Sequence, residues 1–452
     1  MSPSPVRGGL ACSPSICPQK TLSINTVHIP ATKGRCHIST NRWLGAAAAI
    51  AQVQAATITG YDVTTTYTVT INAKIIASLG TGGTVTTTAA ALVVLLNAST
   101  EPEFAEVTWS NSSGTIIGTA DTAGKPFIFT LTVAGGTGTV GAVSSTTANS
   151  GPNDINLAAN WSDGIPTAAD ALYIDSTDVS LLYNLQSLSA VAVTSIDIGQ
   201  NFTGSIGLPK VNADSSTDYH EYRADYWQIQ ATTVNIGYGT GDGSGLIKLD
   251  VGSATATTFN VNNSGSATEA GLEAIQLKGT NAANVLNVNK GSVAVAAFPG
   301  ELATVATLRV GYETSQSSDA AVRCTVGVTL TTINQSGGTL SINGAATTIN
   351  QTGGILTVDG TGAVTTITLD GASMVYNSSG TITTLTVGVD STADFAQDMR
   401  PKTITNEVNL YGGATLNDPF GILTLTAGFQ TQRCRLSQVA IDLGVNRSYT
   451  VA

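Results

Sequence analysis

Charged side chains are scarce in this chain of 452 residues, of which Asp, Glu, Lys and Arg make up only 11 %, whereas an average soluble protein has about 25 %. The shortage of Glu, Lys and Arg excludes long charged helices, in which these residues predominate. Histidine, cysteine and methionine are also rare, with three, five and three copies. We therefore predict no metal site, no cofactor and no framework of disulfide bonds.

Three of the cysteines, Cys12, Cys17 and Cys36, lie near the N-terminus, and Cys36 is followed by His37. Their spacing fits none of the usual zinc-ligand patterns. We interpret them as scattered thiols, which mostly behave as small apolar side chains.

Long apolar runs are missing as well, because no stretch of 18 or more apolar residues occurs, and we expect no membrane-spanning helix. The formal net charge is −11 and is unevenly distributed. Residues 1–42 carry five basic side chains and no acidic one, which leaves 14 of the 19 basic groups beside all 30 acidic groups, a net charge of −16, in the remainder. Such an acidic body argues against nucleic acid as a partner, because phosphates are bound by Lys and Arg gathered on one face.

Residues that favour β-structure are abundant, and they repeat. The chain contains 48 Gly, and 42 % of its residues are hydrophobic. The segment Thr-Thr-Ile-Asn-Gln at residues 331–335 recurs 16 residues later, at residues 347–351. Its isoleucine belongs to a series of apolar residues spaced 16–19 residues apart: Ile333, Ile349, Ile367, Leu385, Ile404 and Leu423. Upstream the series continues with wider spacing through Leu308, Leu286, Phe259 and Val234.

This period predicts a mainly β fold, a parallel β-solenoid (β-helix) over residues 149–452 with insertions in its side loops. One repeat cannot bury its own apolar face, but stacked repeats pair each strand with its equivalents above and below. Ile, Leu and Val would then point inward, and Gly and Asn would form the corners. Trp161, which lies in a segment typical of an opening turn, would cap the apolar end of the stack.

The N-terminal third is organised differently. We predict an extended or disordered basic arm at residues 1–41, a short Ala-rich helix or linker at residues 42–56, and a small α/β docking module at residues 57–148. The expected order in the module is β-β-α-β-β-β, with the helix at residues 87–96. Its strands are expected at residues 66–71, 74–77, 104–109, 114–120 and 126–133.

Residues 42–56 also admit a second interpretation. Arg42 precedes an apolar stretch that ends in small residues, as in a secretory signal peptide. In that alternative, cleavage would fall near Ala55 and Ala56.

The sequence offers little evidence of catalysis. The Gly-rich segment at residues 237–245 lacks the spacing of a phosphate-binding or dinucleotide-binding loop. No Gly-x-Ser-x-Gly nucleophile elbow occurs. We predict no catalytic residue.

One insertion, residues 218–227, stands out because it gathers aromatic and imidazole rings in a chain with only 6 % aromatic residues. The candidate contact residues are Tyr219, His220, Tyr222, Tyr226 and Trp227. Two interpretations of these rings are open: a loop packed on the solenoid flank, or the anchors of an interface with a partner.

The same insertion carries three carboxylates, at Asp218, Glu221 and Asp225. Paired carboxylates beside aromatic platforms are what glycoside hydrolysis requires. A glycan-hydrolysing site is therefore a third interpretation of this loop.

Several segments carry a resemblance to known proteins: Arg42 to Ala46, Tyr67 to Asn72, Ser99 to Glu106, Thr119 to Pro126 and Ala158 to Ser162. Through them, from about Arg42 to its end, the chain resembles a group of uncharacterised structural proteins encoded in tailed-phage and prophage genomes. The resemblance implies a virion protein, and it carries no functional residues over to this sequence.

These observations lead us to expect a non-enzymatic structural component of a phage virion: a fibre, spike or decoration protein of the head or tail with an adhesive or stabilising role. Its partners would be other virion proteins and a host surface glycan. We also expect a homo-oligomer, for which a trimer is one arrangement that buries the solenoid flanks. Two alternatives stay open: a secreted bacterial surface adhesin or cell-wall protein, and a β-helical glycan depolymerase.

Overall fold

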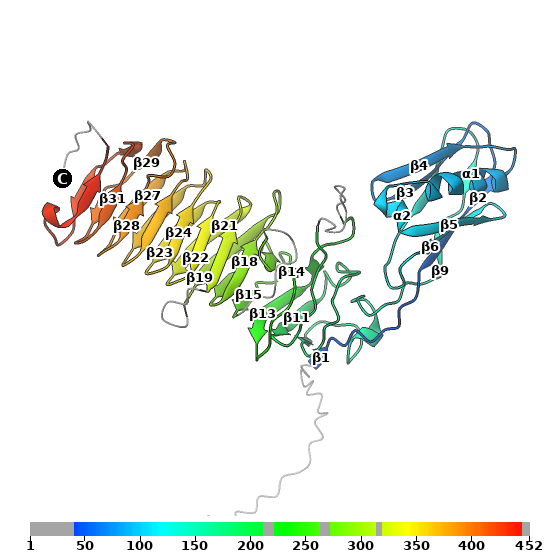
Figure 1. Ribbon diagram of the computed structural model, residues 1–452, viewed down its shortest axis with the longest axis horizontal. Coiled ribbons are helices and arrows are strands. Elements are labelled where there is room, and N and C mark those ends of the chain that lie inside the picture. Colours follow the sequence, from blue (N-terminus) through cyan, green and yellow to red (C-terminus); the bar gives the residue numbers. More distant parts are fainter. Residues whose placement is uncertain (1–39, 211–220, 263–271, 313–318, 445–452) are drawn as a thin grey trace, which may run out of the picture. The chain divides into compact units, whose positions relative to one another are not determined.

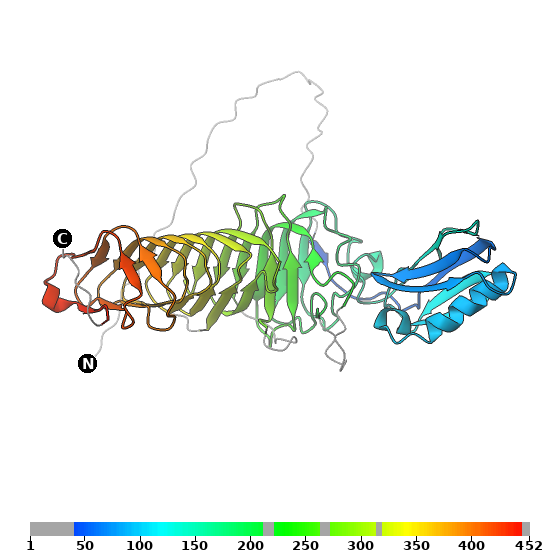
Figure 2. The same ribbon diagram turned by 90° about the horizontal axis from the view of Figure 1, so that it is seen from above.

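Successive turns of the chain stack on one another in register and form two long parallel β-sheets (Figure 1). This computed structural model describes residues 40–210, 221–262, 272–312 and 319–444. All of these residues belong to one compact unit, Ile38–Ala452. The predicted β-solenoid is thereby confirmed, and Figure 2 shows its strands following one another along the stack.

The larger sheet has 15 strands. In spatial order they are β1 (Thr40–Arg42), β10 (Ala171–Ile174), β11 (Ala192–Gly199), β13 (Gln230–Tyr238), β15 (Thr258–Val261), β17 (Val285–Val288), β19 (Ala303–Val310), β21 (Val328–Gln335), β23 (Ala346–Gln351), β25 (Val364–Leu369), β27 (Ile382–Val387), β29 (Lys402–Ile404) and β32 (Leu423–Leu425), with β30 (Val408–Leu410) and β33 (Phe429–Thr431) beside this path.

The second sheet has 11 strands. They are β12 (Trp227–Gln228), β14 (Ile247–Asp250), β16 (Ile275–Lys278), β18 (Gly291–Val295), β20 (Ala320–Cys324), β22 (Thr339–Ile342), β24 (Ile355–Val358), β26 (Ser373–Tyr376), β28 (Thr392–Asp394), β31 (Thr415–Asn417) and β34 (Ala440–Asp442). Two short 3-10 helices, η1 (Ala158–Asn160) and η2 (Leu436–Gln438), lie near the two ends of the stack.

A continuous column of buried apolar side chains runs through the larger sheet, and each member pairs with the next one along the stack. The column confirms the repeat read from the sequence as far as Leu385, and it extends further toward the N-terminus. Its members are Leu172, Ile196, Val234, Phe259, Leu286, Leu308, Ile333, Ile349, Ile367 and Leu385.

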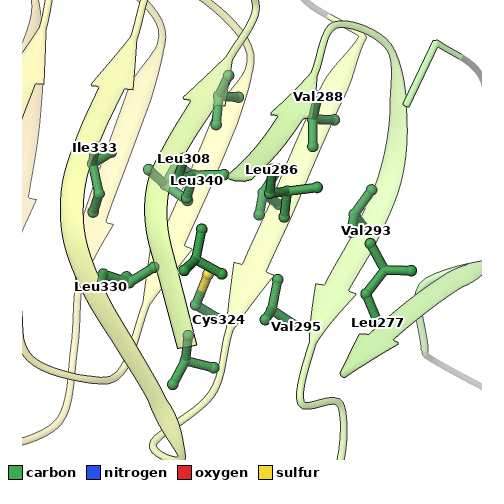
Figure 3. Close-up of a cluster of buried hydrophobic side chains, with 14 of the residues drawn as sticks. Leu277, Leu286, Val288, Val293, Val295, Leu308, Cys324, Leu330, Ile333 and Leu340 are labelled. Carbon is green, nitrogen blue, oxygen red and sulfur yellow. The ribbon is translucent and has the colours of Figure 1, made fainter. Parts of the chain in front are cut away.

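The core lies between the two sheets. Leu286, Leu308 and Ile333 of the larger sheet face Val295 and Leu340 of the second sheet (Figure 3). Each of these side chains is buried. Since burying an aliphatic side chain contributes about 1.5–3 kcal/mol, the stack derives its stability from many such repeated contacts.

Beyond Leu385 the predicted register is wrong. Ile404 pairs with Ile382 rather than with Leu385, and Leu423 pairs with Lys402. The strand is interrupted between β29 and β30, where one extra residue is accommodated before Asn409 pairs with Thr386. This turn is longer than the predicted spacing of 19, because Ile382 and its partner Ile404 are 22 positions apart and Thr386 and its partner Asn409 are 23 apart. The extra residue within the strand, which resembles a β-bulge, accounts for only the last of these positions.

The N-terminal part is an α/β module with two antiparallel sheets. One contains β2 (Val53–Gly60), β5 (Val107–Ser112), β6 (Thr115–Ala120), β8 (Thr139–Val140) and β9 (Ser144–Thr147); the other contains β3 (Thr66–Ile71), β4 (Lys74–Leu79) and β7 (Thr130–Ala134); the helices are α1 (Val85–Asn97) and α2 (Pro102–Ala105). Thr84 caps α1, because its side chain accepts a hydrogen bond of 3.1 Å from the backbone N–H of Thr87. Tyr67, Leu92, Phe104 and Trp109 lie in the core of this module.

Several details of the module differ from the sequence-based prediction. Of the two interpretations of residues 42–56, helix or linker, the helix is absent: residues 43–52 form no α-helix, and β2 begins at Val53. Residues 126–129 are not part of a strand, because Phe127 and Phe129 donate their backbone N–H groups to the buried side-chain oxygens of Gln52 and Gln54.

The solenoid begins before the module rather than after it. Strand β1 precedes the module in sequence, yet it pairs in parallel with β10, so that Asn41 lies beside Leu172. The α/β module is therefore an insertion between the first two strands of the larger sheet.

Tryptophan side chains close the N-terminal end of the stack. The rings of Trp43 and Trp161 meet edge to face with centroids 5.0 Å apart. Trp43 Nε1 donates to the carbonyl oxygen of Val179 at 2.8 Å, and Trp161 Nε1 donates to that of Ile155 at 2.9 Å. Trp161 thus lies at the apolar end of the stack, as its sequence context indicates. Trp43, which precedes the inserted module in sequence, packs against it there.

Candidate functional site

In the predicted contact loop, the three described rings, those of Tyr222, Tyr226 and Trp227, point in different directions. Tyr219 and His220 lie outside the described residues, as does Asp218. Tyr222 is half-buried and contacts the α/β module, whereas Tyr226 and Trp227 are buried. In this structure the last two rings cannot anchor a partner on the surface, because no face of either is exposed.

Trp227 is the first residue of β12 and points into the solenoid core. Its ring lies 6.4 Å from that of Trp161, centroid to centroid. This residue extends the aromatic end of the stack, and its role is packing.

Tyr226 lies between two lysines on the outer side of the second sheet. The Nζ atoms of Lys248 and Lys278 are 4.8 and 4.1 Å from its ring centroid, in cation–π geometry. Its hydroxyl group forms a hydrogen bond of 3.1 Å with Glu301 Oε2. Phe298 covers Lys248, with 4.9 Å between Nζ and the ring centroid.

Carboxylates balance these lysines. Asp225 pairs with Lys248 at 3.0 Å, although the Lys248 side chain is completely buried, and Lys278 lies 3.7 Å from Asp250 and 3.6 Å from Glu301. The solenoid register brings these charges together, because β14 and β16 pair Asp250 directly with Lys278. The sequence analysis missed this cluster. The sequence does show charged residues within these two strands, but their proximity could be predicted only if the pairing register of the strands were known.

The second group of charges joins the loop to the α/β module. The Arg223 guanidinium forms an ion pair with Glu106 and another with Glu221, and its Nε donates to the carbonyl oxygen of Pro126 at 2.7 Å. Tyr222 donates its hydroxyl hydrogen to the same Glu106 carboxylate at 2.8 Å. Lys125 pairs with the other oxygen of Glu106 at 2.5 Å.

The electrostatics of this junction favour the charged form of Arg223. Burial by itself would lower the pKa of its guanidinium, but the negative charges of Glu106 and its neighbours outweigh burial and raise the pKa. Tyr183 lies in the same environment, where burial raises the pKa of its phenol. Arg223 is therefore present at the junction as a guanidinium cation.

A cleft of about 320 Å³ lies beside this junction. The module contributes residues of β3, of the following turn and of the segment leading into β7. The solenoid contributes a turn near Asn184 and the loop that carries Tyr222. Of the three predicted site residues that the structure describes, Tyr222 lines this cleft and Tyr226 and Trp227 do not.

The loop carboxylates that a glycosidase would use are engaged elsewhere in the described part of the chain. Glu221 accepts from Arg223, and Asp225 pairs with Lys248. Both carboxylates thus hold the loop in place in this structure.

The described residues contain no group of three or more His, Cys, Asp or Glu that could hold a metal ion. The longest of their helices, α1, has 13 residues, and none of the helices described could span a bilayer. Cys324 is buried and Cys434 is partly exposed, and both are free thiols.

The chain matches no described protein family, and no curated protein and no solved structure matches it. Any assignment of function therefore depends on the sequence and geometry of the chain itself.

Proposed function

We propose that this chain is a non-enzymatic structural component of a phage virion, in which the solenoid acts as a rigid spacer and the α/β module as the docking or adhesive end. The fibre, spike and decoration roles expected from the sequence all fall within this proposal. Its location would be the virion, and its partners other virion proteins and a host surface glycan.

The observation that supports the proposal most is the unbroken parallel ladder from β10 to β27, in which one apolar column continues through all the turns. Such stacks resist local opening, because each turn is hydrogen-bonded to the turn on either side. Side-chain ladders add to this on the outer surface: Asn260 donates to Asn235, and Asn287 donates to Asn260, both at 2.9 Å. A stiff, protease-resistant spacer is what a particle exposed outside a cell requires.

The junction with the module is also built for attachment. The module is connected to the solenoid by two chain segments, which pair with each other where Ile50 bridges Ser150. The ion pair of Arg223 with Glu106 adds a third connection. A force on a docking unit held in this way reaches the spacer through several connections and does not depend on one flexible linker.

The test is to locate the full chain in native material. Particles from a strain that carries the gene would be purified on a density gradient, and the protein measured by quantitative mass spectrometry and by immunogold labelling. A soluble host protein of equal abundance serves as the control for contamination. We expect a fixed copy number per particle; enrichment no greater than that of the control would refute the virion role.

The two alternatives predict different outcomes for the same material. A secreted adhesin would be found in the cell wall with a new N-terminus near Ala55 and Ala56, a cut that would fall inside β2. A depolymerase would release reducing ends from capsular polysaccharide, and the Glu221→Gln variant would lose that activity. Sedimentation velocity of the full chain tests the expected oligomer, since a monomer at micromolar concentration would contradict it.

A further inference from the structure

The cleft beside the junction has the size of a small-ligand site. Its volume of about 320 Å³ lies at the lower end of the range of about 300–1,000 Å³ that ligand pockets occupy. It therefore has room for a short ligand rather than for a folded partner or a long polymer lying across it.

The cleft is lined by uncharged hydrogen-bonding side chains together with apolar ones, among them Phe127 and Ile128. Thr70 and Thr130 contribute hydroxyl groups, and Asn72, Asn184 and Gln186 contribute amides. Each amide carries both a donor and an acceptor. Hydroxyl groups of a ligand also donate and accept, so this lining matches a polyol.

Local structure fixes the side-chain amide of Asn184 and the backbone at Asn72. Asn72 occupies the turn between β3 and β4 with φ +54°, a conformation that Asn adopts more readily than most residues. Asn184 Nδ2 donates to Asp154 Oδ2 at 2.7 Å, and Asp154 is buried. Groups held in this way lose little freedom when a ligand binds.

The charge in the cleft wall is already neutralised. Among the described residues that line the cleft, Arg223 alone is charged, and its guanidinium bonds to Glu106, Glu221 and Pro126. An anionic ligand would have to compete with these carboxylates, whereas a neutral ligand would not. Ile128, which is 71 % exposed, adds apolar surface at the cleft, as the C–H faces of a sugar ring require.

We propose that this cleft binds a neutral saccharide unit of a cell-surface glycan through the amides and hydroxyls of its lining. The inference deepens the adhesive part of the proposed function and rests on it, since it names the class of ligand and places the site where module and solenoid meet. The cleft replaces the aromatic loop as the contact site, and it retains Tyr222 from that loop.

The experiment uses the full chain and saturation-transfer NMR with neutral sugars as probes: glucose, galactose, mannose, rhamnose, N-acetylglucosamine and their disaccharides, each at about 10 mM to detect dissociation constants near 1 mM. Glucuronic acid and sialic acid are included as anionic probes. We expect saturation transfer to at least one neutral sugar, and weaker transfer to the anionic ones. No transfer to any neutral sugar, or stronger transfer to the anionic ones, would overturn the proposal.

Two double variants locate the binding. Thr130→Ala with Gln186→Ala removes two exposed lining groups, and the expected loss of affinity is about tenfold, since one net hydrogen bond contributes about 0.5–1.5 kcal/mol. The matched control, Thr132→Ala with Ser187→Ala, changes exposed neighbours outside the lining and is expected to bind as the wild type does. Equal binding by both variants would place the sugar elsewhere and contradict the site.

Incorporation into particles separates this proposal from the virion role. The Thr130→Ala, Gln186→Ala variant is expected to enter particles at the wild-type copy number, because neither side chain forms part of the junction ion pairs. If the wild-type chain enters particles but binds no sugar, the saccharide site is refuted and the virion role is not. A chain that binds sugar but is absent from particles refutes the virion role alone.

Discussion

Arg223 of the solenoid and Glu106 of the α/β module form an ion pair across 117 positions of the sequence, with side chains that are only 10 % and 16 % exposed. Around this pair, Tyr222, Glu221 and Lys125 complete a network that belongs to both parts of the chain. The junction between module and solenoid is therefore a packed contact and not a free hinge.

The first prediction concerns this pair. Glu106→Gln leaves Arg223 buried without its main counter-charge, which we expect to cost about 3 kcal/mol. The loss should appear as faster hydrogen exchange in β5 and in residues 221–224. The control is Glu101→Gln, which breaks a pair with Lys74 that is half-exposed on both sides and should leave the stability almost unchanged, because solvent screens exposed pairs. Equal effects of the two variants would show that the junction pair has no special role.

Closure of the N-terminal end gives a second prediction. Trp43→Ala removes the edge-to-face contact with Trp161 and the hydrogen bond to Val179, and we expect it to cost about 3–5 kcal/mol. Because β1 and β10 lie at that end, hydrogen exchange should rise in β10 and remain unchanged in β25. Leu44→Ala, at a neighbouring residue that is 43 % exposed, should leave exchange as in the wild type. Uniform acceleration across the stack would contradict a local role in closing this end.

The apolar column gives a third prediction. Ile349 is completely buried between Ile333 and Ile367. Replacing it with alanine should cost about 2–5 kcal/mol, because neighbouring turns cannot collapse into the cavity. The measurement is the midpoint of urea unfolding, followed by circular dichroism. Thr348→Ala, which changes the adjacent outward side chain, should shift the midpoint far less, and a similar shift would argue against the inward assignment of Ile349.

Cysteine reactivity gives a fourth prediction. Burial raises the pKa of the Cys324 thiol to about 12. At pH 8 this group is therefore protonated, and the thiolate that alkylating reagents need forms only far above that pH. Peptide mass spectrometry after brief treatment with iodoacetamide should find Cys434 modified and Cys324 unmodified. In denaturant both should react, and modification of native Cys324 at the rate of Cys434 would contradict its burial.

The repeat could be predicted from sequence because its contacts join equivalent positions in neighbouring turns. Ile333, Ile349 and Ile367 occupy the same position in short repeats. The two-residue period of a strand shows that side chains at this position point inward. Even the wide spacing between Phe259 and Leu286 was read correctly, since added residues leave through the loops and do not disturb the column. The series failed at Ile404 and Leu423, because the turn after Leu385 is longer than the period predicts and only one of its additional residues lies inside the strand.

The candidate site could not be predicted in the same way. Arg223 meets Glu106, and Asn184 shares a cleft with Thr70, through contacts between segments that no period relates. The aromatic composition of the loop drew attention to residues 218–227, yet composition does not reveal which rings are buried. Trp227 packs into the solenoid core, whereas Tyr226 is buried on the outer side of the second sheet, between Lys248 and Lys278.

Placement of β1 ahead of the inserted module has a mechanical consequence. Any load applied to the module reaches the stack by two covalent routes, one through residues 43–52 and one through residues 148–170, so neither strand bears the whole tension. A single protease cut in either route would leave the module attached. A lateral force on the module is therefore shared by two chain segments, and it does not peel the first turn away from the stack.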